Sequence, residues 1–315
     1  GTVAQNNDCP GQMVSSWNNE NLGGSYCTAD LQFLQDLIDN SGFELGVLEV
    51  AEQSWVDGRL LQLEGNEINL SGNLPSSLTE VNQLMVLDLE SNSLTGSLPN
   101  NIGDLKSLIR LQLGDNDLSG PLPDSLGQLT EVTLLSLHSN NFTGTIPMTL
   151  GQMAAMVNLN LARNELTGVI PSSLSAIEDL KYLYLYGNDL EGPLTAAIGD
   201  LSELIHLFLY DNQIAGSIPT EVGNISTLQS LLLQNNQLTG TIPNSIGSLT
   251  NLSSLKLADN QLSGDVPDSL CNLSLTWSTG FSAENNQLCG NVPTCLIDEI
   301  GAQNCGAGDA GIAPF

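Results

Sequence analysis

Basic residues are scarce in this chain of 315 residues, which holds six lysines and arginines against 35 aspartates and glutamates. The formal net charge of −29 argues against nucleic acid and anionic membranes as partners, because both repel an acidic protein. Aromatic residues make up only 4% of the chain, so leucine has to fill the core and a cluster of aromatics becomes informative. No apolar run is long enough to span a bilayer.

Cysteine is absent from the middle of the chain. The six cysteines stand near the two ends, at Cys9, Cys27, Cys271, Cys289, Cys295 and Cys305. This placement predicts disulfides that seal both ends, and therefore an oxidising, extracellular compartment. We expect Cys9 to pair with Cys27, whereas the four C-terminal cysteines allow three pairings. No paired C-x-x-C spacing occurs, and we expect neither a metal nor a cofactor.

Five N-x-S/T glycosylation sequons agree with an extracellular location. They start at Asn69, Asn141, Asn224, Asn251 and Asn272. A chain with these features fits a secreted protein or a cell-surface ectodomain.

An asparagine returns every 24 residues through the middle of the chain. The eight copies are Asn92, Asn116, Asn140, Asn164, Asn188, Asn212, Asn236 and Asn260. A glycine follows each asparagine four residues later, and in seven of the eight copies a proline comes three residues further on. A fixed period of this length predicts a solenoid of stacked coils. An earlier asparagine, Asn66, lies six residues before Gly72, so we expect a two-residue insertion in that turn.

Each repeat contains one short strand. In the copy from 84 to 99, Leu87 and Leu89 alternate and should point into the coil, whereas Val86, Asp88 and Glu90 should point outward. Stacking the copies places these strands side by side in a parallel sheet, about 4.8 Å apart. The asparagine amide can satisfy backbone groups where the chain leaves the strand, so we interpret the asparagines as an interior hydrogen-bond ladder.

The repeats divide the chain into four predicted segments. They are an N-terminal cap with a helix (1–55), the repeats (56–270), a last repeat with a cysteine cap (271–305) and a flexible tail (306–315). Thr28 is predicted to cap the helix, which should stop near Gly42. One face of this helix gathers Leu31, Leu34, Leu37 and Ile38, and it should cover the end of the leucine core.

Aligning the outward positions of successive strands produces the main functional signal. Four of the five tyrosines, a phenylalanine and a histidine fall on two adjacent strands. With the residues that border them, the candidate ligand-binding residues are Tyr182, Tyr184, Tyr186, His206, Phe208, Tyr210, Leu232, Arg163, His138 and Lys256. An exposed apolar patch of this kind usually has a partner, so we predict a binding surface. The alternative is that neighbouring rings merely pack on each other.

An acidic cluster lies nearer the N-terminus. It consists of Glu64, Asp88, Glu90 and Asp115, with Glu64 and Glu90 expected as neighbours in one column. Carboxylates at this spacing can bind calcium, although a solvated acidic face is the interpretation we favour. No serine or cysteine stands beside a base, and His138 and His206 are too far apart along the repeats to act together. We therefore predict that the protein is not an enzyme.

The repeat unit L-x-x-L-x-L-x-x-N-x-L-x-G-x-[IL]-P-x-x-[IL]-G-x-L resembles the leucine-rich repeat of plant-type receptor ectodomains and polygalacturonase-inhibiting proteins, over roughly 56–293. The segment from Asn286 to Cys295 also resembles that family's C-terminal cap. The resemblance implies an α/β solenoid, a right-handed superhelix of about ten 24-residue coils with a parallel sheet on its concave face and disulfide-sealed caps.

Three departures from the family pattern stand out. The family's N-terminal Cys-x-Trp-x-Gly-Val-x-Cys is missing, Thr195 replaces the repeat proline, and Asn66 is displaced from its glycine. The Arg-x-Arg pair with which some receptors of the family hold a peptide carboxylate is represented only by Arg110-x-Gln112.

Three functions compete at this point. The leading one is an extracellular recognition module that binds a peptide, protein or glycan on its concave face, with a membrane co-receptor implied if the chain belongs to a larger receptor. The second is an inhibitor of a secreted cell-wall-degrading enzyme, for which acidity would steer a basic target. The third is a structural or adhesive solenoid. Ice binding, a variant of the third, needs a regular threonine column, and Glu191 and Ala215 interrupt the one available.

Overall fold

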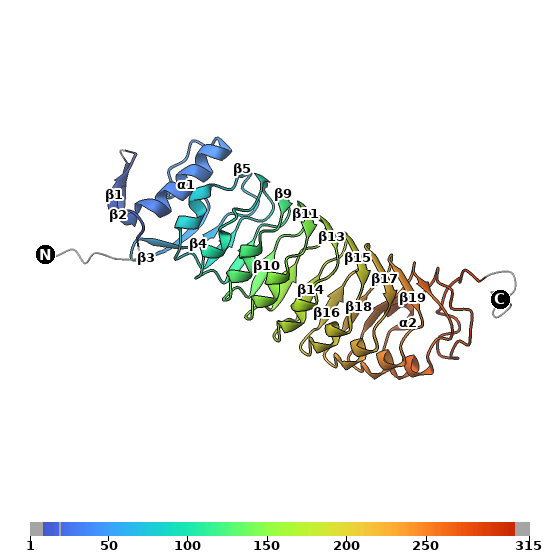
Figure 1. The fold of residues 1–315 in the computed structure, drawn as a ribbon. Helices are drawn as coiled ribbons and strands as arrows, with labels where there is room; N and C mark the ends of the chain where they lie inside the picture. Colours follow the sequence, from blue (N-terminus) through green and yellow to red (C-terminus); the bar gives the residue numbers. More distant parts are fainter. Residues whose placement is uncertain (1–8, 19, 306–315) are drawn as a thin grey trace. The chain divides into compact units, whose positions relative to one another are not determined.

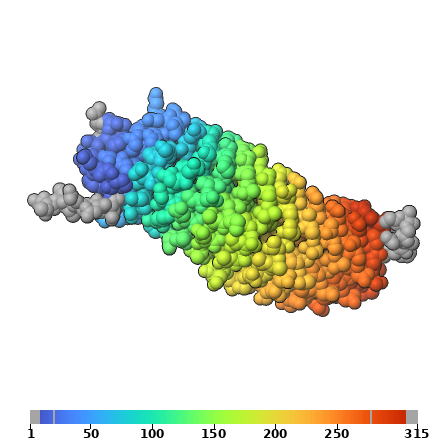
Figure 2. Space-filling view, viewed as in Figure 1, coloured from blue at the N-terminus to red at the C-terminus, as the bar shows by residue number. Residues whose placement is uncertain are grey.

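The computed structural model of the protein describes residues 9–18 and 20–305 (Figure 1). The predicted tail 306–315 lies outside the described residues. The described chain falls into two compact units, one within residues 1–143 and the other within 144–315. Within each unit the coils follow one another in sequence order and pack closely on their neighbours (Figure 2).

The N-terminal cap of the first unit consists of a hairpin and a helix. Strands β1 (Met13–Trp17) and β2 (Glu20–Cys27) are antiparallel, and α1 (Thr28–Ser41) follows directly. The predicted Cys9–Cys27 disulfide is present. The prediction that Thr28 caps the helix is wrong: Cys27 is the N-cap residue, and the Thr28 hydroxyl instead accepts the N–H of Gln12 at 2.9 Å. The helix stops as predicted at Gly42, whose φ of 69° is left-handed.

A buried ion pair ties this cap to the first repeat strand. The predicted apolar face of α1 is buried, and the same face carries the carboxylate of Asp30, which is fully buried. Arg59, at the start of β4 (Arg59–Glu64), donates to both Asp30 oxygens at 2.9 and 3.2 Å. The backbone N–H of Leu60 adds a third bond to Asp30 at 2.8 Å. The bidentate geometry and the extra donor compensate the carboxylate for its loss of water.

The main sheet of the first unit presents one short strand from each coil. Its members are β4, β6 (Val86–Asp88), β8 (Arg110–Gln112) and β10 (Leu134–Ser136), with β3 (Glu52–Val56) antiparallel to β4 at the end. A second sheet is formed by β5 (Ser71–Asn73), β7 (Ser93–Gly96), β9 (Asp117–Pro121) and β11 (Asn141–Thr145). The outer turns are the 3-10 helices η1 (Ser76–Glu80), η2 (Ile102–Asp104) and η3 (Asp124–Gln128).

The second unit repeats this plan. Its main-sheet strands are β12 (Asn158–Asn160), β14 (Tyr182–Tyr184), β16 (His206–Phe208), β18 (Ser230–Leu232), β20 (Ser254–Lys256) and β22 (Phe281–Ser282). Its second-sheet strands are β13 (Glu165–Gly168), β15 (Asp189–Pro193), β17 (Gln213–Ser217), β19 (Gln237–Gly240) and β21 (Gln261–Leu262). The helices are η4 (Met148–Gln152), η5 (Ser172–Ala176), η6 (Ala196–Asp200), η7 (Thr220–Asn224), η8 (Asn244–Ser248), η9 (Asp268–Asn272) and α2 (Trp277–Gly280).

The C-terminal cap closes with two disulfides. The structure pairs Cys271 with Cys295 and Cys289 with Cys305, which selects one of the three connectivities that the sequence left open. Thr195, which replaces the repeat proline, keeps the same extended backbone as the prolines at its position, with φ −81° and ψ 155°. The substitution therefore leaves the path of the coil unchanged.

The repeated asparagines form the interior ladder that the sequence predicts. The Asn116 side-chain amide donates to the carbonyls of Leu89 and Leu113 at 3.0 and 3.2 Å, and its oxygen accepts the N–H of Leu94 at 2.9 Å. Asn188 repeats this pattern in the second unit. Each side chain therefore satisfies backbone groups of two consecutive coils, which would otherwise be buried without partners.

The prediction of an inserted turn at Asn66 is wrong. Ile68, not Asn66, occupies the ladder position of the first coil. The Asn92 oxygen accepts the N–H of Leu70, two residues after Ile68, just as the Asn116 oxygen accepts that of Leu94, two residues after Asn92. Strands β4 and β6 pair at an offset of 24 residues, as β6 and β8 do, so the coil has the standard length. Asn66 is an exposed residue that happens to precede the ladder position by two.

Asn66 and Asn92 provide a matched stability test. Replacing Asn92 with alanine should lower the free energy of unfolding by about 3 kcal/mol, because buried N–H and carbonyl groups lose their partner. Replacing Asn66 with alanine should cost less than about 1 kcal/mol, since its one bond to the N–H of Glu90 is exposed. Urea denaturation followed by circular dichroism measures both, and equal losses would contradict the assignment of Ile68 to the ladder.

The buried ion pair makes a second prediction. Arg59→Met should lower the free energy of unfolding by about 3–5 kcal/mol, because it leaves the Asp30 carboxylate buried without its cation. The double variant Asp30→Leu/Arg59→Met should lose less, since it removes both charges. Lys106→Met, at an exposed lysine whose ammonium contacts Gln128, is the control and should cost under about 1 kcal/mol. A double variant as unstable as the single one would show that charge burial is not the cause.

Candidate functional site

Two adjacent strands of the second unit carry the aromatic side chains. Strands β14 and β16 pair in parallel, with Tyr182 beside His206 and Tyr184 beside Phe208. Between them Leu183 is fully buried in the coil, so period-two alternation sends the flanking rings to the opposite face. Two further tyrosines follow the strands. We call the set the aromatic patch; its members are Tyr182, Tyr184, Tyr186, His206, Phe208 and Tyr210.

The rings of the aromatic patch pack against one another. Tyr186 and Tyr210 stack with centroids 4.4 Å apart and planes 8° apart, and His206 stacks on Phe208 at 5.1 Å and 9°. Tyr184 bridges the two strands through its contact with Phe208 at 4.9 Å. All six residues are half-buried, so part of each residue stays accessible to solvent. The patch is thus a continuous surface whose rings partly shield each other's faces.

One hydrogen bond fixes the protonation pattern of the patch. The Tyr184 hydroxyl lies 2.8 Å from Nδ1 of His206. Burial, with smaller effects from Tyr182 and Tyr186, raises the pKa of Tyr184, and burial lowers the pKa of His206. At neutral pH the tyrosine is therefore the donor and the neutral imidazole the acceptor, which places the ring proton of His206 on Nε2.

The neighbouring Tyr210 is also held in its neutral form. Burial raises the pKa of Tyr210 to about 12. The charge on Tyr186 and the hydrogen bond between the two tyrosines also raise this pKa. The exposed Arg163 lies over the Tyr186 ring, 5.8 Å from its centroid, where the ring quadrupole attracts a cation. At neutral pH the patch therefore offers hydroxyls and one imidazole N–H, with a single guanidinium at its border.

The remaining candidate residues behave differently. Leu232 pairs with Phe208 across β16 and β18, so it extends the patch by one strand. Lys256 pairs with Leu232, but its ammonium donates to the backbone carbonyls of Thr279 and Phe281 at 2.6 and 3.2 Å. His138 belongs to the first unit, where its ring contacts two carboxylates.

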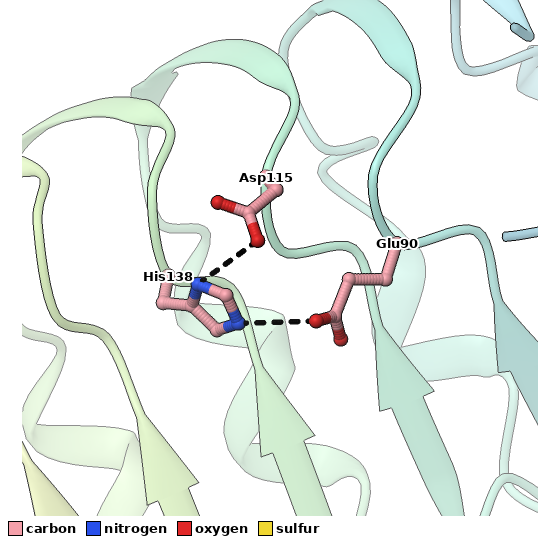
Figure 3. Close-up of side chains that lie close together, drawn as sticks. All are labelled: Glu90, Asp115 and His138. Carbon is pink, nitrogen blue, oxygen red and sulfur yellow. Dashed lines mark ion pairs between the residues drawn. The ribbon is translucent and has the colours of Figure 1, made fainter. Parts of the chain in front are cut away.

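That second cluster consists of Glu90, Asp115 and His138 (Figure 3). Nε2 of His138 lies 3.4 Å from Glu90, and Nδ1 lies 3.9 Å from Asp115. Glu90 and His138 are two coils apart in one column, with Gly114 between them. A Cβ at Gly114 would come within 2.6 Å of Nε2, so the missing side chain is what lets the imidazole reach Glu90.

The expected acidic cluster is therefore rearranged. Glu64 pairs with Asp88 and not with Glu90, because the first coil has no insertion. Asp88 is buried at 4% exposure, with the Arg110 guanidinium 3.9 Å away. The expected column of Glu64 and Glu90 is wrong, and the sequence did not reveal His138 as the partner of Glu90 and Asp115. Gly114 was the signal that could have revealed it, since a glycine on an outward position opens a path between side chains two coils apart.

The cluster has the residue types of a metal site, with one ligand atom of each residue within 4.8 Å of the others. A single ion would need one imidazole nitrogen and both carboxylates on the same side. Here the two nitrogens of one ring face different carboxylates (Figure 3). The Ser139 hydroxyl also lies 3.2 Å from Nδ1, so the contacts of the ring are made within the protein, and we assign no metal to the cluster.

The role of Gly114 can be tested directly. Gly114→Ala should push the His138 ring off Glu90, because the new methyl group would occupy the space of Nε2. The chain has only two histidines, so the ring signals of His138 and His206 can be followed separately by NMR. The His138 signal should move and the His206 signal should stay. An unchanged His138 signal would mean that the ring already lies away from Glu90.

Comparison with known families and structures bears on the identity of the fold. A Leucine rich repeat profile matches residues 130–190, and a second Leucine Rich Repeat profile matches 83–105, 107–129, 227–249 and 251–273. With these matches and the ladder in place, the family follows. The chain is a leucine-rich repeat protein of the plant type. The predicted leucine-rich repeat solenoid with disulfide caps is confirmed.

Three solved structures of plant proteins are similar to this leucine-rich repeat protein. The ectodomain of the Arabidopsis thaliana receptor kinase GASSHO1/SCHENGEN3, in complex with CASPARIAN STRIP INTEGRITY FACTOR 2, is 35% identical with a TM-score of 0.67, over 72% of this chain and 27% of that one. The Arabidopsis receptor kinase HAESA, in complex with the peptide hormone IDA and the co-receptor SERK1, is 30% identical with a TM-score of 0.74, over 81% and 43%. A plant ice-binding protein is 24% identical with a TM-score of 0.70, over 90% and 99%, which shows the fold alone.

Three further findings concern the extent of the similarity and the absence of a membrane-spanning helix among the described residues. The chain spans less than half the length of these two receptor structures. No curated protein matches it by sequence. Among the residues that the structure describes, no helix has the length and apolarity needed to cross a membrane.

Proposed function

We propose that this leucine-rich repeat protein is an extracellular recognition module, without catalytic activity, that binds its ligand over the aromatic patch. The observation that carries the proposal is the aromatic patch itself. In a chain with 4% aromatic residues, six rings from two coils lie in mutual contact on the accessible face of the main sheet. Interfaces place their binding energy in clustered aromatic residues of this kind.

The distribution of sequons supports the same face. All five sequon asparagines are exposed, and none lies on a main-sheet strand. Asn141 starts β11 of the second sheet, while Asn224 and Asn272 end the helices η7 and η9. Glycans at these positions would leave the main sheet bare. The disulfides at both ends and the receptor ectodomains among the similar structures support an extracellular location.

The chemistry of the patch favours a peptide ligand. One face of the Tyr186 ring is covered by Tyr210 and Arg163 lies over the ring, so it offers a sugar little open surface for stacking. Ring edges and hydroxyl groups suit side chains and backbone amides of a peptide, and the receptor HAESA was solved with a peptide hormone. A peptide captured here would be held by its middle, because the patch has only Arg163 to meet a terminal carboxylate.

The proposal is tested with combined peptide and glycan arrays. Wild type should bind a peptide, and Tyr184→Ser/Phe208→Ser should lose about 4 kcal/mol of binding free energy, roughly a thousandfold in affinity, because two adjoining anchors are removed. Ser254→Ala changes a half-buried residue on the same face outside the patch and should bind like wild type. Circular dichroism should show that all three proteins are folded.

Other outcomes point elsewhere. Retained binding in the double variant would overturn the patch as the site. Binding to glycans but to no peptide would show that the ligand is a glycan. Inhibition of a wall-degrading enzyme by a protein that binds no peptide would favour the inhibitor function. Ice binding has only the fold likeness behind it, and the exposed Glu191 breaks the threonine column of the second unit. Thermal hysteresis in a protein that binds neither array would reopen that alternative.

A further inference from the structure

The His206 ring lies inside the aromatic patch, where it is the one group able to gain a charge between pH 4.5 and 7.5. It stacks on Phe208 at 5.1 Å, meets Tyr182 edge-on at 5.2 Å and accepts the Tyr184 hydroxyl at Nδ1. The imidazole can accept the hydrogen bond from Tyr184 only while it is neutral, because a protonated Nδ1 is a donor.

We propose that protonation of His206 gates the aromatic patch, so that the patch binds its ligand at neutral pH and releases it at acid pH. This inference rests on the proposed function, because it concerns the regulation of the same site.

The groups that face the ring from each strand account for the gate. Tyr182 and Tyr184 come from β14. Phe208 lies on β16, the strand of His206 itself, and Ser230 lies on β18, where it pairs with His206. None of the four is a carboxylate that could neutralise an imidazolium. The charged residues within three positions of these strands in sequence are Asp179, Lys181, Glu203 and Asp211, and burial lowers the pKa of His206.

Protonation changes the patch in two ways. The Nδ1 acceptor becomes a donor, so the Tyr184 hydroxyl has to turn its proton away, and the hydrogen bond survives only in reversed form. The ring also acquires a charge that water solvates better than the faces of Phe208 and Tyr182 do. The charged ring should therefore move toward solvent and disrupt the stack to which a ligand would bind.

Ligand binding and protonation then oppose each other. A ligand that covers the patch removes more water from His206 and favours the neutral ring still further, so binding releases a proton. Affinity consequently falls by up to tenfold for each pH unit below the ring's midpoint in the free protein.

Protonation of His206 lowers the stability of the fold as well as the affinity for the ligand. The folded state holds the proton of His206 less tightly than the unfolded chain, whose histidine titrates near pH 6.5. Stability is therefore fully present above about pH 6.5 and declines as the pH falls through the lowered pKa of the folded state.

The gate is tested first on the protein without ligand. In protein labelled with ¹⁵N-histidine, the His206 ring should show the Nε2–H tautomer at pH 7.5 and a titration midpoint below 6.5. Tyr184→Phe keeps the ring but removes the hydroxyl, so the midpoint should rise. A midpoint at or above 6.5 in wild type, or one unchanged in Tyr184→Phe, would overturn the proposed hydrogen-bond switch.

The second arm measures binding with N-acetyl-L-tyrosinamide, an aromatic peptide fragment that is uncharged from pH 4.5 to 7.5. Its dissociation constant for wild type, followed by NMR shifts of the patch residues, should rise at least tenfold between pH 7.5 and 4.5. His206→Gln cannot take up a proton and should bind equally at both pH values. His138 is present in both proteins, so it cannot produce the difference.

The outcomes separate the two proposals. Binding by wild type that is equally strong at both pH values would overturn the gate and leave the proposed function intact. The same loss at acid pH in His206→Gln would also overturn the gate. Absence of probe binding at pH 7.5, together with silent arrays, would overturn the proposed function, and the gate would fall with it.

Discussion

The hydrogen-bond ladder of repeated asparagines is the constraint on which the rest of this structure depends. Each amide joins the backbone of two consecutive coils, as Asn116 does with Leu89 and Leu113, and so fixes the offset at 24 residues. A constant offset turns sequence columns into rows of adjacent side chains. The contact of Tyr184 with Phe208 and the reach of His138 over Gly114 to Glu90 both follow from it.

The same chain uses its outward columns in two different ways. In the first unit a glycine gap brings a histidine between two carboxylates, which yields a polar cluster that satisfies itself (Figure 3). In the second unit the columns are filled with rings, and burial keeps Tyr210, Tyr184 and His206 in their neutral forms at neutral pH. An uncharged, aromatic surface on a protein of net charge −29 is well suited to a partner that the acidic remainder would not attract.

The sequence predicted what its period controls and failed where the period is interrupted or where a contact is not local. The ladder, the buried leucines, the end of α1 at Gly42 and the gathering of the six rings all follow from spacing. The insertion at Asn66 was wrong because a chance asparagine stood two residues before the ladder position held by Ile68. The Asp30–Arg59 pair joins residues 29 apart in a cap without repeats, and the pairing of the C-terminal cysteines depends on three-dimensional proximity, so neither could be read from a pattern.

The central claim is that the aligned rings are the binding surface, and the five tyrosines of the chain allow a direct measurement. Four belong to the aromatic patch, and the fifth, Tyr26, packs against Trp55 in the N-terminal cap. In protein with ¹³C-labelled tyrosine rings, titration with the peptide selected on the array should shift the signals of the four patch tyrosines with one common dissociation constant, while Tyr26 stays in place. Peptide binding that leaves the four patch signals unmoved would contradict the account.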